Sequence, residues 1–297
     1  MLHKLSQLFQ KSTKTRHRHH LNEKSSQFTQ QVITSTCFWR NPPQLQTIFE
    51  QLLPKLQTAK PQTLRLGVHA GSIGCEAISL QMASNYYQFP RPIEIVSTEI
   101  DSKAVQKARR GKFEPQHFLE PGSADHTLLP PELIEQFTKR ACFNKIQIKQ
   151  NLLKQIKFEQ CDLASRSATL QFGQFDLIFF QNAIVHINPD AAQQCVANLI
   201  ETANPNSLIF LGGTAGDQLS RLAHQFNLLP LNANNEMVYN GWSWRQSIWG
   251  QFPSSHLGME PFDAQHADAQ YRYAHVFALE TGRDFWQPFI DNESVAQ

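Results

Sequence analysis

Acidic residues after one apolar run and a glycine turn after another are the groups in this chain best suited to chemistry. The run IEIVSTEID ends in Glu99 and Asp101. In LRLGVHAGSIGCEAISLQM, alternating apolar residues give way to helical spacing across a turn that contains Gly71 and Gly74. A carboxylate can accept from the hydroxyls of a ribose, and such a turn lets a ligand lie against the backbone and the helix N-terminus. The two stretches together predict a nucleoside-containing ligand.

The elements that must position these residues alternate along the chain. Short apolar runs predict strands, and helical spacing predicts helices between them. The run FDLIFF at 175–180 is almost continuously apolar, as in a strand covered on both faces. The alternation indicates an α/β fold, a three-layer α/β/α sandwich. Strands are expected at 64–68, 93–101, 175–180, 207–211 and 274–279, with a long loop at 111–130.

Residues 34–281 are expected to form one α/β domain. A basic, partly helical segment precedes it at 1–33, and a C-terminal tail follows at 282–297. Short β-like pieces at about 138–160 predict a small β-hairpin subdomain. Residues 232–270 hold three tryptophans without a clear period. This Trp-rich insert is either a lid or partner surface, or a packed structural excursion, and both interpretations stay open.

Composition excludes several classes of protein. Hydrophobic residues make up 41% and charged residues 18% of the 297 residues, as in ordinary globular proteins. No apolar run approaches the roughly 20 residues of a membrane span, and residues 1–21 lack the core of a secretory signal. Five scattered cysteines without a C-x-x-C pair indicate free thiols in a reducing compartment. We therefore expect a cytoplasmic protein without a zinc site, and we interpret His17, His19 and His20 as part of a basic patch.

The net charge of +2 is unevenly distributed. Residues 1–24 carry six lysine and arginine residues against Glu23, a net of +5, which leaves −3 on the remainder. A nucleic-acid-binding domain is basic throughout or has interleaved aromatic residues, so nucleic acid is not an expected partner. The basic segment is either a solvated terminus or a partner-binding arm.

Most of the chain resembles a known family. The stretch FDLIFFQNAIVHINPD at 175–190 is similar to the strand-and-loop signature of the CheR family of chemotaxis receptor glutamate O-methyltransferases, which reads FDxIxCRNVLIYF. Other family landmarks occur in the same order, over about 34–231 and 271–280. They are TCFWR for T-x-F-F-R, AGSIGCEAISLQM for S-T-G-E-E-x-Y-S-L-A-M, STEIDSKAVQKARRGKF for TDID-x-x-x-L-x-x-A-R-x-G-x-Y, Asp-Leu for Asn-Leu, and HVFAL for T-V-Y-A-L. Each is weak alone, but together they are specific.

The resemblance implies a class I S-adenosylmethionine (SAM) methyltransferase fold with a small added β-subdomain. It implies transfer of the SAM methyl group to glutamate side chains in the cytoplasmic domain of methyl-accepting chemotaxis receptors, by a monomer. The family usually has several helices before T-x-F-F-R, whereas about 33 residues precede it here. The basic patch at 11–20 is expected to contact the receptor, as a smaller substitute for those helices. The short N-terminus and the divergent loop favour a pilus-linked, twitching-motility branch.

The resemblance also implies which residues contact the cofactor. Arg40, Gln181 and His186 are expected to act at the methyl-transfer step. The expected cofactor contacts are Thr34, Thr36 and Arg40 at the methionine end, Gly71, Gly74 and Glu76 at the first turn and helix, Glu99 and then Asp101 at the ribose, Asp162 and Leu163 beside the adenine, and Gln181 and Asn182 above the sheet.

These residue types suit SAM and a carboxylate acceptor. Arg40 can bind a carboxylate through two hydrogen bonds, and charged hydrogen bonds are each worth roughly 1.5–3 kcal/mol. The acceptor glutamate is ionised at pH 7, since its unperturbed pKa is about 4.3. The reaction therefore needs alignment and exclusion of water, which can supply roughly 7–11 kcal/mol, but no general base.

Five positions depart from the family pattern and leave alternatives open. Gln181 removes a positive charge from beside the reacting carboxylates, which also fits a SAM-binding regulatory scaffold without catalysis. A small-molecule carboxyl methyltransferase is a second alternative. We expect Gln181→Arg to leave activity unchanged or to raise it. The departures are Cys75 for Glu, Glu99 for Asp, Asp162 for Asn, Gln181 for Arg and His186 for Tyr.

Overall fold

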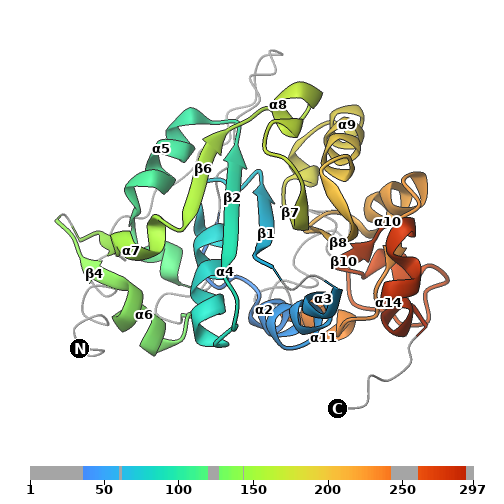
Figure 1. The fold of residues 1–297 in the computed structure, drawn as a ribbon, viewed down its shortest axis with the longest axis horizontal. Coiled ribbons are helices and arrows are strands. Elements are labelled where there is room, and N and C mark those ends of the chain that lie inside the picture. The colour runs from blue at the N-terminus through green and yellow to red at the C-terminus, as the bar shows by residue number, and fades with distance from the viewer. Residues whose placement is uncertain (1–35, 60–61, 120–126, 143, 242–259, 292–297) are drawn as a thin grey trace.

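A seven-stranded sheet lies at the centre of the molecule (Figure 1). The computed structural model describes residues 36–59, 62–119, 127–142, 144–241 and 260–291. The first five strands in the order below are parallel, and β10 is antiparallel to both β8 and β9. This confirms the expected α/β architecture. The spatial order is β6 (Ile156–Gln160), β2 (Ile93–Glu99), β1 (Leu64–His69), β7 (Phe175–Gln181), β8 (Ala203–Gly212), β10 (Val276–Ala278) and β9 (Leu229–Pro230).

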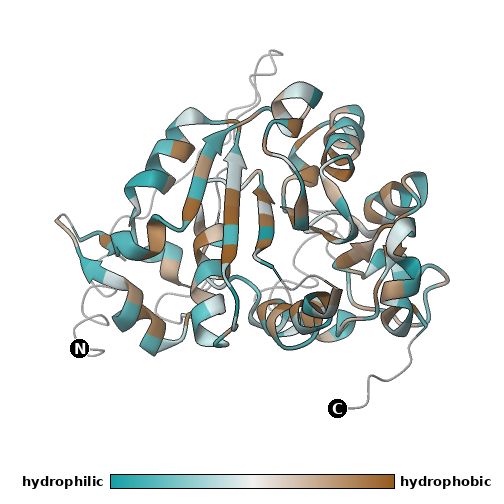
Figure 2. Cartoon of the chain, in the orientation of Figure 1, coloured by the Kyte–Doolittle hydropathy of each residue, from teal (hydrophilic) through white to brown (hydrophobic). Residues whose placement is uncertain are grey.

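Helices cover both faces of the sheet. In β7, Leu177 and Phe179 enter one apolar core and Ile178 and Phe180 enter the other, because successive side chains of a strand point to opposite faces. Figure 2 shows apolar residues concentrated along the central strands. The first core includes residues of α2 (Pro42–Thr47), a π-helical turn (Ile48–Leu52), α3 (Leu53–Ala59), α4 (Cys75–Tyr86) and α5 (Ser102–Arg110); the second includes residues of α9 (Pro189–Ile200) and α10 (Gly216–Gln225), with part of α8 (Arg166–Leu170) packed against it.

The small β-subdomain differs from the hairpin expected at 138–160. It is a three-stranded sheet of β3 (Lys112–Phe113), β5 (Ile146–Ile148) and β4 (Thr138–Arg140). The strand β6 instead joins the main sheet beside β2, because its alternate residues Ile156 and Phe158 are buried there. Helix α6 (Pro131–Phe137) lies between β3 and β4 of the small sheet, and α7 (Gln150–Leu153) leads from β5 of the small sheet to β6 of the main sheet.

The loop expected at 111–130 contains β3 and a 3₁₀ turn, Pro115–Phe118. Phe113 and Phe118 are buried, and the Phe118 ring stacks on Phe38 with 4.4 Å between ring centroids. Aromatic packing therefore orders the first part of this stretch. It also anchors the segment that contains Phe38, which leads into α2.

The expectation of a C-terminal tail at 282–297 is wrong for residues 283–290, which form helix α14 (Arg283–Ile290). Trp286 is 0% exposed, and its Nε1 donates to the carbonyl of Asn206 at 3.1 Å. Phe289 is buried, and Phe285 packs against the same core. These three aromatic residues lie on one face of the helix, so residues 283–290 complete the domain.

The first part of the Trp-rich insert packs on the domain. Helix α11 (Asn235–Asn240) contacts α2, and Asn41 Nδ2 donates to the Val238 carbonyl at 2.9 Å. Helix α13 (Ala269–Arg272) follows the part that is not described. The three tryptophans and the whole segment 1–33 lie outside the described residues. None of the described helices is long and apolar enough to cross a membrane.

Candidate functional site

A cavity of about 950 Å³ lies at the carboxyl ends of β1, β2 and β7. Its walls come from the loops after these strands, from the start of α4, and from residues 36–45 ahead of and within α2. Parallel α/β sheets bind ligands at this edge, outside the carboxyl ends of their strands. Of the residues expected at the site, the cavity wall includes Thr36, Arg40, Gly71, Glu76, Glu99, Gln181, Asn182 and His186.

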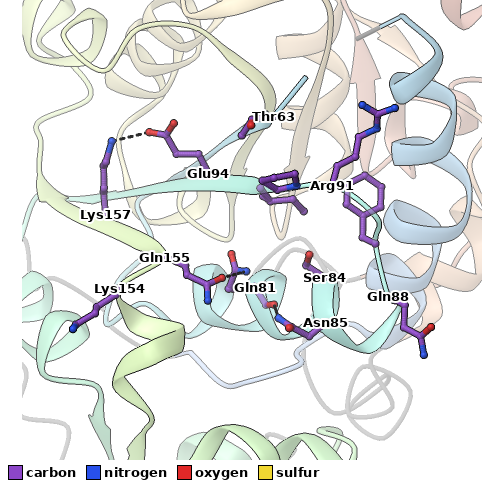
Figure 3. Close-up of a pocket in the computed structure, with 13 residues that line it drawn as sticks. Thr63, Gln81, Ser84, Asn85, Gln88, Arg91, Glu94, Lys154, Gln155 and Lys157 are labelled. Carbon is purple, nitrogen blue, oxygen red and sulfur yellow. Dashed lines mark hydrogen bonds and ion pairs between the residues drawn. The ribbon is translucent and has the colours of Figure 1, made fainter. Parts of the chain in front are cut away.

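A second hollow, of about 720 Å³, lies at the opposite, amino ends of β1 and β2 (Figure 3). Its wall includes Thr63 and Ile93, and an ion pair of 2.8 Å joins Lys157 and Glu94 within this wall. None of the residues expected at the site lines this hollow. We therefore assign the candidate site to the larger cavity.

The turn after β1 has a backbone that only a few residues tolerate. Ala70 and Ser72 have φ of 53°, and Gly74 has φ of 91°. A Cβ at Gly71 would lie 2.5 Å from Ser97 Oγ, so the turn can approach β2 only with glycine there. Gly74 caps α4, and a Cβ there would lie 2.8 Å from the Phe158 ring. Gly71 thus borders the cavity, whereas Gly74 serves helix packing and does not line it.

Glu99 is held at the end of β2 by two backbone amides. Its Oε2 accepts from Ser72 N at 2.8 Å and its Oε1 from Asp101 N at 3.0 Å. A carboxylate has about four acceptor positions, so lone pairs remain for a ligand in the cavity. Asp101 does not line the cavity; its side chain accepts from Lys103 N at 2.8 Å and caps α5. Ile100, 54% exposed, lies between them and forms part of the wall.

The segment before α2 places Arg40 in the cavity wall. Trp39 is buried with φ of 56°, and its backbone N–H donates to Ser79 Oγ at 2.9 Å. Asn41 then caps α2 by accepting from Gln44 N at 3.3 Å, with Pro42 in the first turn. The expected residue Thr36 lines the cavity. Thr34 lies outside the described residues.

Glu76 and Gln181 meet in the cavity. Gln181 Nε2 donates to Glu76 Oε1 at 2.8 Å, and it also donates to Gln44 Oε1 at 3.2 Å. Burial raises the pKa of the Glu76 carboxyl, while the charge of Arg40 and the bond from Gln181 act in the opposite direction. Two residues expected separately at the cofactor are therefore joined directly, a contact that the sequence did not predict, and Gln181 is also bound by Gln44 of α2.

The loop after β7 brings Asn182 and His186 to the same cavity. Asn182 has φ of 56°, and a Cβ at Gly213 would lie 2.1 Å from its Oδ1, so glycine is required for this close approach. His186 is half-buried, and its pKa is lowered by burial and by the charge of Arg40. The ring is therefore neutral at pH 7 and keeps one N–H donor.

Asp162 and Leu163 are not brought to the cavity. Asp162 is exposed, and its Oδ1 accepts from Ala164 N at 3.0 Å. Leu163 is buried in the core under α8 and α9, and its carbonyl accepts from Asn198 Nδ2 at 2.8 Å. The order of the motifs correctly predicts that both residues follow a strand, which is β6. The Asp162 side chain bonds within the loop after β6, however, and the Leu163 side chain packs in the core.

Sequence reasoning missed several residues of the cavity wall. Gln44 follows the Pro-Pro stop by one residue, and its helical position predicts only a surface or core role. His275 is the first residue of the HVFAL motif, whose pattern predicts only a strand. The missed residues that matter below are Gln44, Ser72, Ile100 and His275. Within the described ranges, no three His, Cys, Asp or Glu side chains are grouped as metal ligands.

The chain is similar in sequence to known chemotaxis methyltransferases. The chain is 23% identical over 201 residues to "Chemotaxis protein methyltransferase 2" of Vibrio cholerae, covering 66% of each chain. It is 25% identical over 206 residues to "Chemotaxis protein methyltransferase" of Vibrio anguillarum, covering 68% of this chain and 70% of the other. The chain thus spans about two thirds of the length of these relatives.

A solved structure and a family model complete the comparison. The magnesium protoporphyrin IX methyltransferase of Synechocystis, solved with bound SAM, is 14% identical with a TM-score of 0.35, covering 63% of this chain and 70% of the other. The model of the CheR methyltransferase, SAM binding domain, matches residues 34–234. Because that match spans more than half of the chain, the protein belongs to the family of CheR methyltransferase SAM-binding domains.

Proposed function

We propose that this protein transfers the methyl group of SAM to glutamate side chains of chemoreceptors. The observation that carries the proposal is the cavity at the carboxyl ends of β1, β2 and β7, where Glu99, Glu76 and Arg40 come together in a CheR-family fold. The names of the relatives, which are chemotaxis protein methyltransferases, support the pathway.

The polar groups of the cavity fit SAM. The Glu99 carboxylate, fixed by Ser72 and Asp101, would accept from the ribose hydroxyls, and Ile100 offers an apolar surface beside it. Arg40 would bind the carboxylate of the methionine end, and Glu76 its ammonium group. When bound, SAM supplies an electrophilic methyl group on a sulfonium.

The protein's own groups then have to orient and shield the reactants. A glutamate acceptor is ionised at neutral pH, so none of the cavity residues needs to remove a proton. Neutral His186 can donate a hydrogen bond to the acceptor carboxylate near Arg40. Gln181 and Asn182 form the wall where the acceptor would approach. Positioning of this kind can lower a barrier by roughly 7–11 kcal/mol.

Charge distribution supports an acidic macromolecular partner. Residues 100–119 and 127–160 carry eleven lysine and arginine residues against five aspartate and glutamate residues. In the other described parts of the chain, eight basic residues stand against sixteen acidic ones. Lys112 and Lys139 are exposed and flank Gln147 in register on the small sheet. The β-subdomain side would thus attract the glutamate-rich cytoplasmic domain of a receptor, and the protein would act in the cytoplasm as a monomer.

The test uses purified protein, methyl-labelled SAM and receptor-containing membranes. Label on a receptor-sized band that mild base releases as methanol is the expected result, because carboxyl methyl esters are base-labile. Label on soluble carboxylic acids alone would favour the small-molecule alternative and contradict the proposal.

A regulatory scaffold is the second candidate, and the observation in its favour is Gln181. Both hydrogens of the Gln181 amide are engaged, by Gln44 and Glu76, and the side chain brings no positive charge to the acceptor. A scaffold would bind SAM and transfer no label in the same assay, whereas an enzyme does both.

A further inference from the structure

A buried histidine lies in the wall of the candidate site. His275 is 6% exposed and precedes β10. Its Nε2 lies 2.8 Å from the carbonyl oxygen of Ala233, and its Nδ1 lies 3.2 Å from Gln44 Nε2. A carbonyl can only accept, so Nε2 carries the proton and donates it. Burial lowers the pKa of His275 to about 4, so the ring is neutral at pH 7 and its Nδ1 is an acceptor.

Gln44 and Gln181 form a reciprocal pair of amides. Gln44 Nε2 donates to Gln181 Oε1 at 3.0 Å, and Gln181 Nε2 donates to Gln44 Oε1 at 3.2 Å. The second hydrogen of Gln44 Nε2 goes to His275 Nδ1, and the second hydrogen of Gln181 Nε2 goes to Glu76 Oε1. All four amide hydrogens of the two glutamines therefore have acceptors, and the chain of bonds runs from Ala233 to Glu76.

Only one direction of this chain satisfies its members. If the Gln44 amide turned over, its oxygen would face the lone pair of His275 Nδ1. The Gln181 amide would then have to turn as well, and its oxygen would face the Glu76 carboxylate. Gln44 is 8% exposed, so water cannot easily replace the lost bonds. The proton on His275 Nε2 thus selects, from the opposite end of the chain, the same Gln181 orientation that the Glu76 carboxylate requires.

We propose that His275 and Gln44 are positioning residues of the SAM site, which fix the Gln181 amide so that it donates to Glu76. In this arrangement Gln181 occupies Oε1 of Glu76, and Glu76 itself lines the cavity in which the cofactor would bind. Two neutral side chains thereby orient Gln181. The inference concerns SAM affinity and holds whichever carboxylate accepts the methyl group.

Two substitutions at His275 separate positioning from anchoring. In His275→Asn, the amide oxygen can take the place of Nδ1 and accept from Gln44. In His275→Gln, the longer amide can take the place of Nε2 and donate to Ala233, but it offers Gln44 no acceptor. We expect calorimetry to give a SAM Kd within about threefold of wild type for His275→Asn and roughly tenfold weaker for His275→Gln.

A matched control addresses folding. His69 is also fully buried, its Nδ1 lies 2.9 Å from Thr98 Oγ1, and it does not line the cavity. His69→Asn is expected to lower the free energy of unfolding without changing the Kd for SAM. Gln44→Leu is expected to weaken SAM binding as His275→Gln does, and the double variant to lose no more than either, because the two residues act in one chain.

Nitrogen-15 NMR of the imidazole rings gives an independent readout. With the His275 signals assigned by their absence in His275→Asn, we expect a neutral ring with its proton on Nε2 at pH 7, with and without SAM. A ring protonated on Nδ1 would overturn the proposal. So would equal SAM affinity of the asparagine and glutamine variants, or weaker binding by His275→Asn, which is the order expected if His275 only anchors residue 233.

Discussion

The backbone amide of Ser72 donates to Glu99 Oε2 at 2.8 Å, so the turn after β1 holds the carboxylate at the end of β2. Because β1 and β2 pair in parallel, the turn after β1 lies beside the end of β2 and can fix the Glu99 carboxylate there. Ser72 has a left-handed φ of 53° in this turn. The proposed function would use the carboxylate held in this way to bind the ribose.

Replacement of Glu99 by glutamine tests this arrangement. In Glu99→Gln, one of the two backbone donors, Ser72 N or Asp101 N, would face an NH₂ group, and a charged acceptor would be lost. We expect SAM affinity to fall at least tenfold, since hydrogen bonds to charged groups are worth roughly 1.5–3 kcal/mol. Calorimetry measures it, with Glu94→Gln at the opposite end of β2 as the control. Equal losses in both variants would show that the carboxylate is not a ligand.

The structure changes the expectation for Gln181→Arg. Gln181 Oε1 accepts from Gln44 Nε2, and a guanidinium offers no acceptor there. We now expect Gln181→Arg alone to weaken SAM binding, because a buried amide hydrogen of Gln44 loses its partner. The double variant Gln44→Ala/Gln181→Arg removes that amide and makes room, and is expected to bind SAM more tightly than Gln181→Arg. Unchanged SAM affinity in the single variant would contradict the amide pairing.

Stability should depend on pH through two buried histidines. Burial lowers the pKa of His69 to about 3 and of His275 to about 4, from 6.5 in the unfolded chain. Between pH 6.5 and 4 the unfolded state therefore binds protons that the folded state does not. The free energy of unfolding should fall as pH falls through this window, by up to about 1.4 kcal/mol per pH unit for each histidine.

Urea unfolding at several pH values measures this slope. His275→Asn and His69→Asn should each flatten it, and His224→Asn, an exposed position, should not. A slope that is the same in all four proteins would mean that other groups cause the acid sensitivity.

Helix α14 should stabilise the domain. Trp286 is fully buried and bonded to the Asn206 carbonyl, so Trp286→Ala is expected to cost about 3–5 kcal/mol. Phe285→Ala, at a partly buried position of the same helix, should cost less. Chemical denaturation compares them, and a negligible effect of Trp286→Ala would restore the interpretation of this segment as a tail.

Charge reversal tests the proposed docking face. Lys112→Glu with Lys139→Glu should raise the KM for receptor membranes and weaken its dependence on salt, since exposed charges act over a Debye length of about 8–10 Å. SAM affinity should not change. Arg166→Glu on α8 together with Arg221→Glu on α10, two exposed positions in the acidic part of the chain, is the matched control, because it changes the net charge by the same amount. An equal rise in KM for the control would point to net charge rather than to a face.

Motif order predicted the sheet and much of the site because it fixes where strands end. Arg40, Glu76, Glu99 and Gln181 therefore reach one cavity as expected. A motif position does not fix the direction of a side chain. Asp101 accepts a hydrogen bond from the backbone N–H of Lys103 and therefore caps a helix instead of lining the cavity.

Long-range packing could not be predicted from local patterns. Gln44 and His275 are 231 residues apart in sequence, and only the tertiary fold brings them together. The strand at 156–160 shows ordinary β alternation, which cannot say which sheet it joins. Its burial beside β2 decides this.

The most direct test of the account is peptide mapping, by mass spectrometry, of receptor membranes incubated with the protein and SAM. We expect methyl esters on glutamate side chains of the receptor's cytoplasmic domain, and none when Glu99→Gln replaces the wild-type protein at SAM concentrations well below the Kd of that variant. Receptors that stay unmethylated while the wild-type protein binds SAM would contradict it.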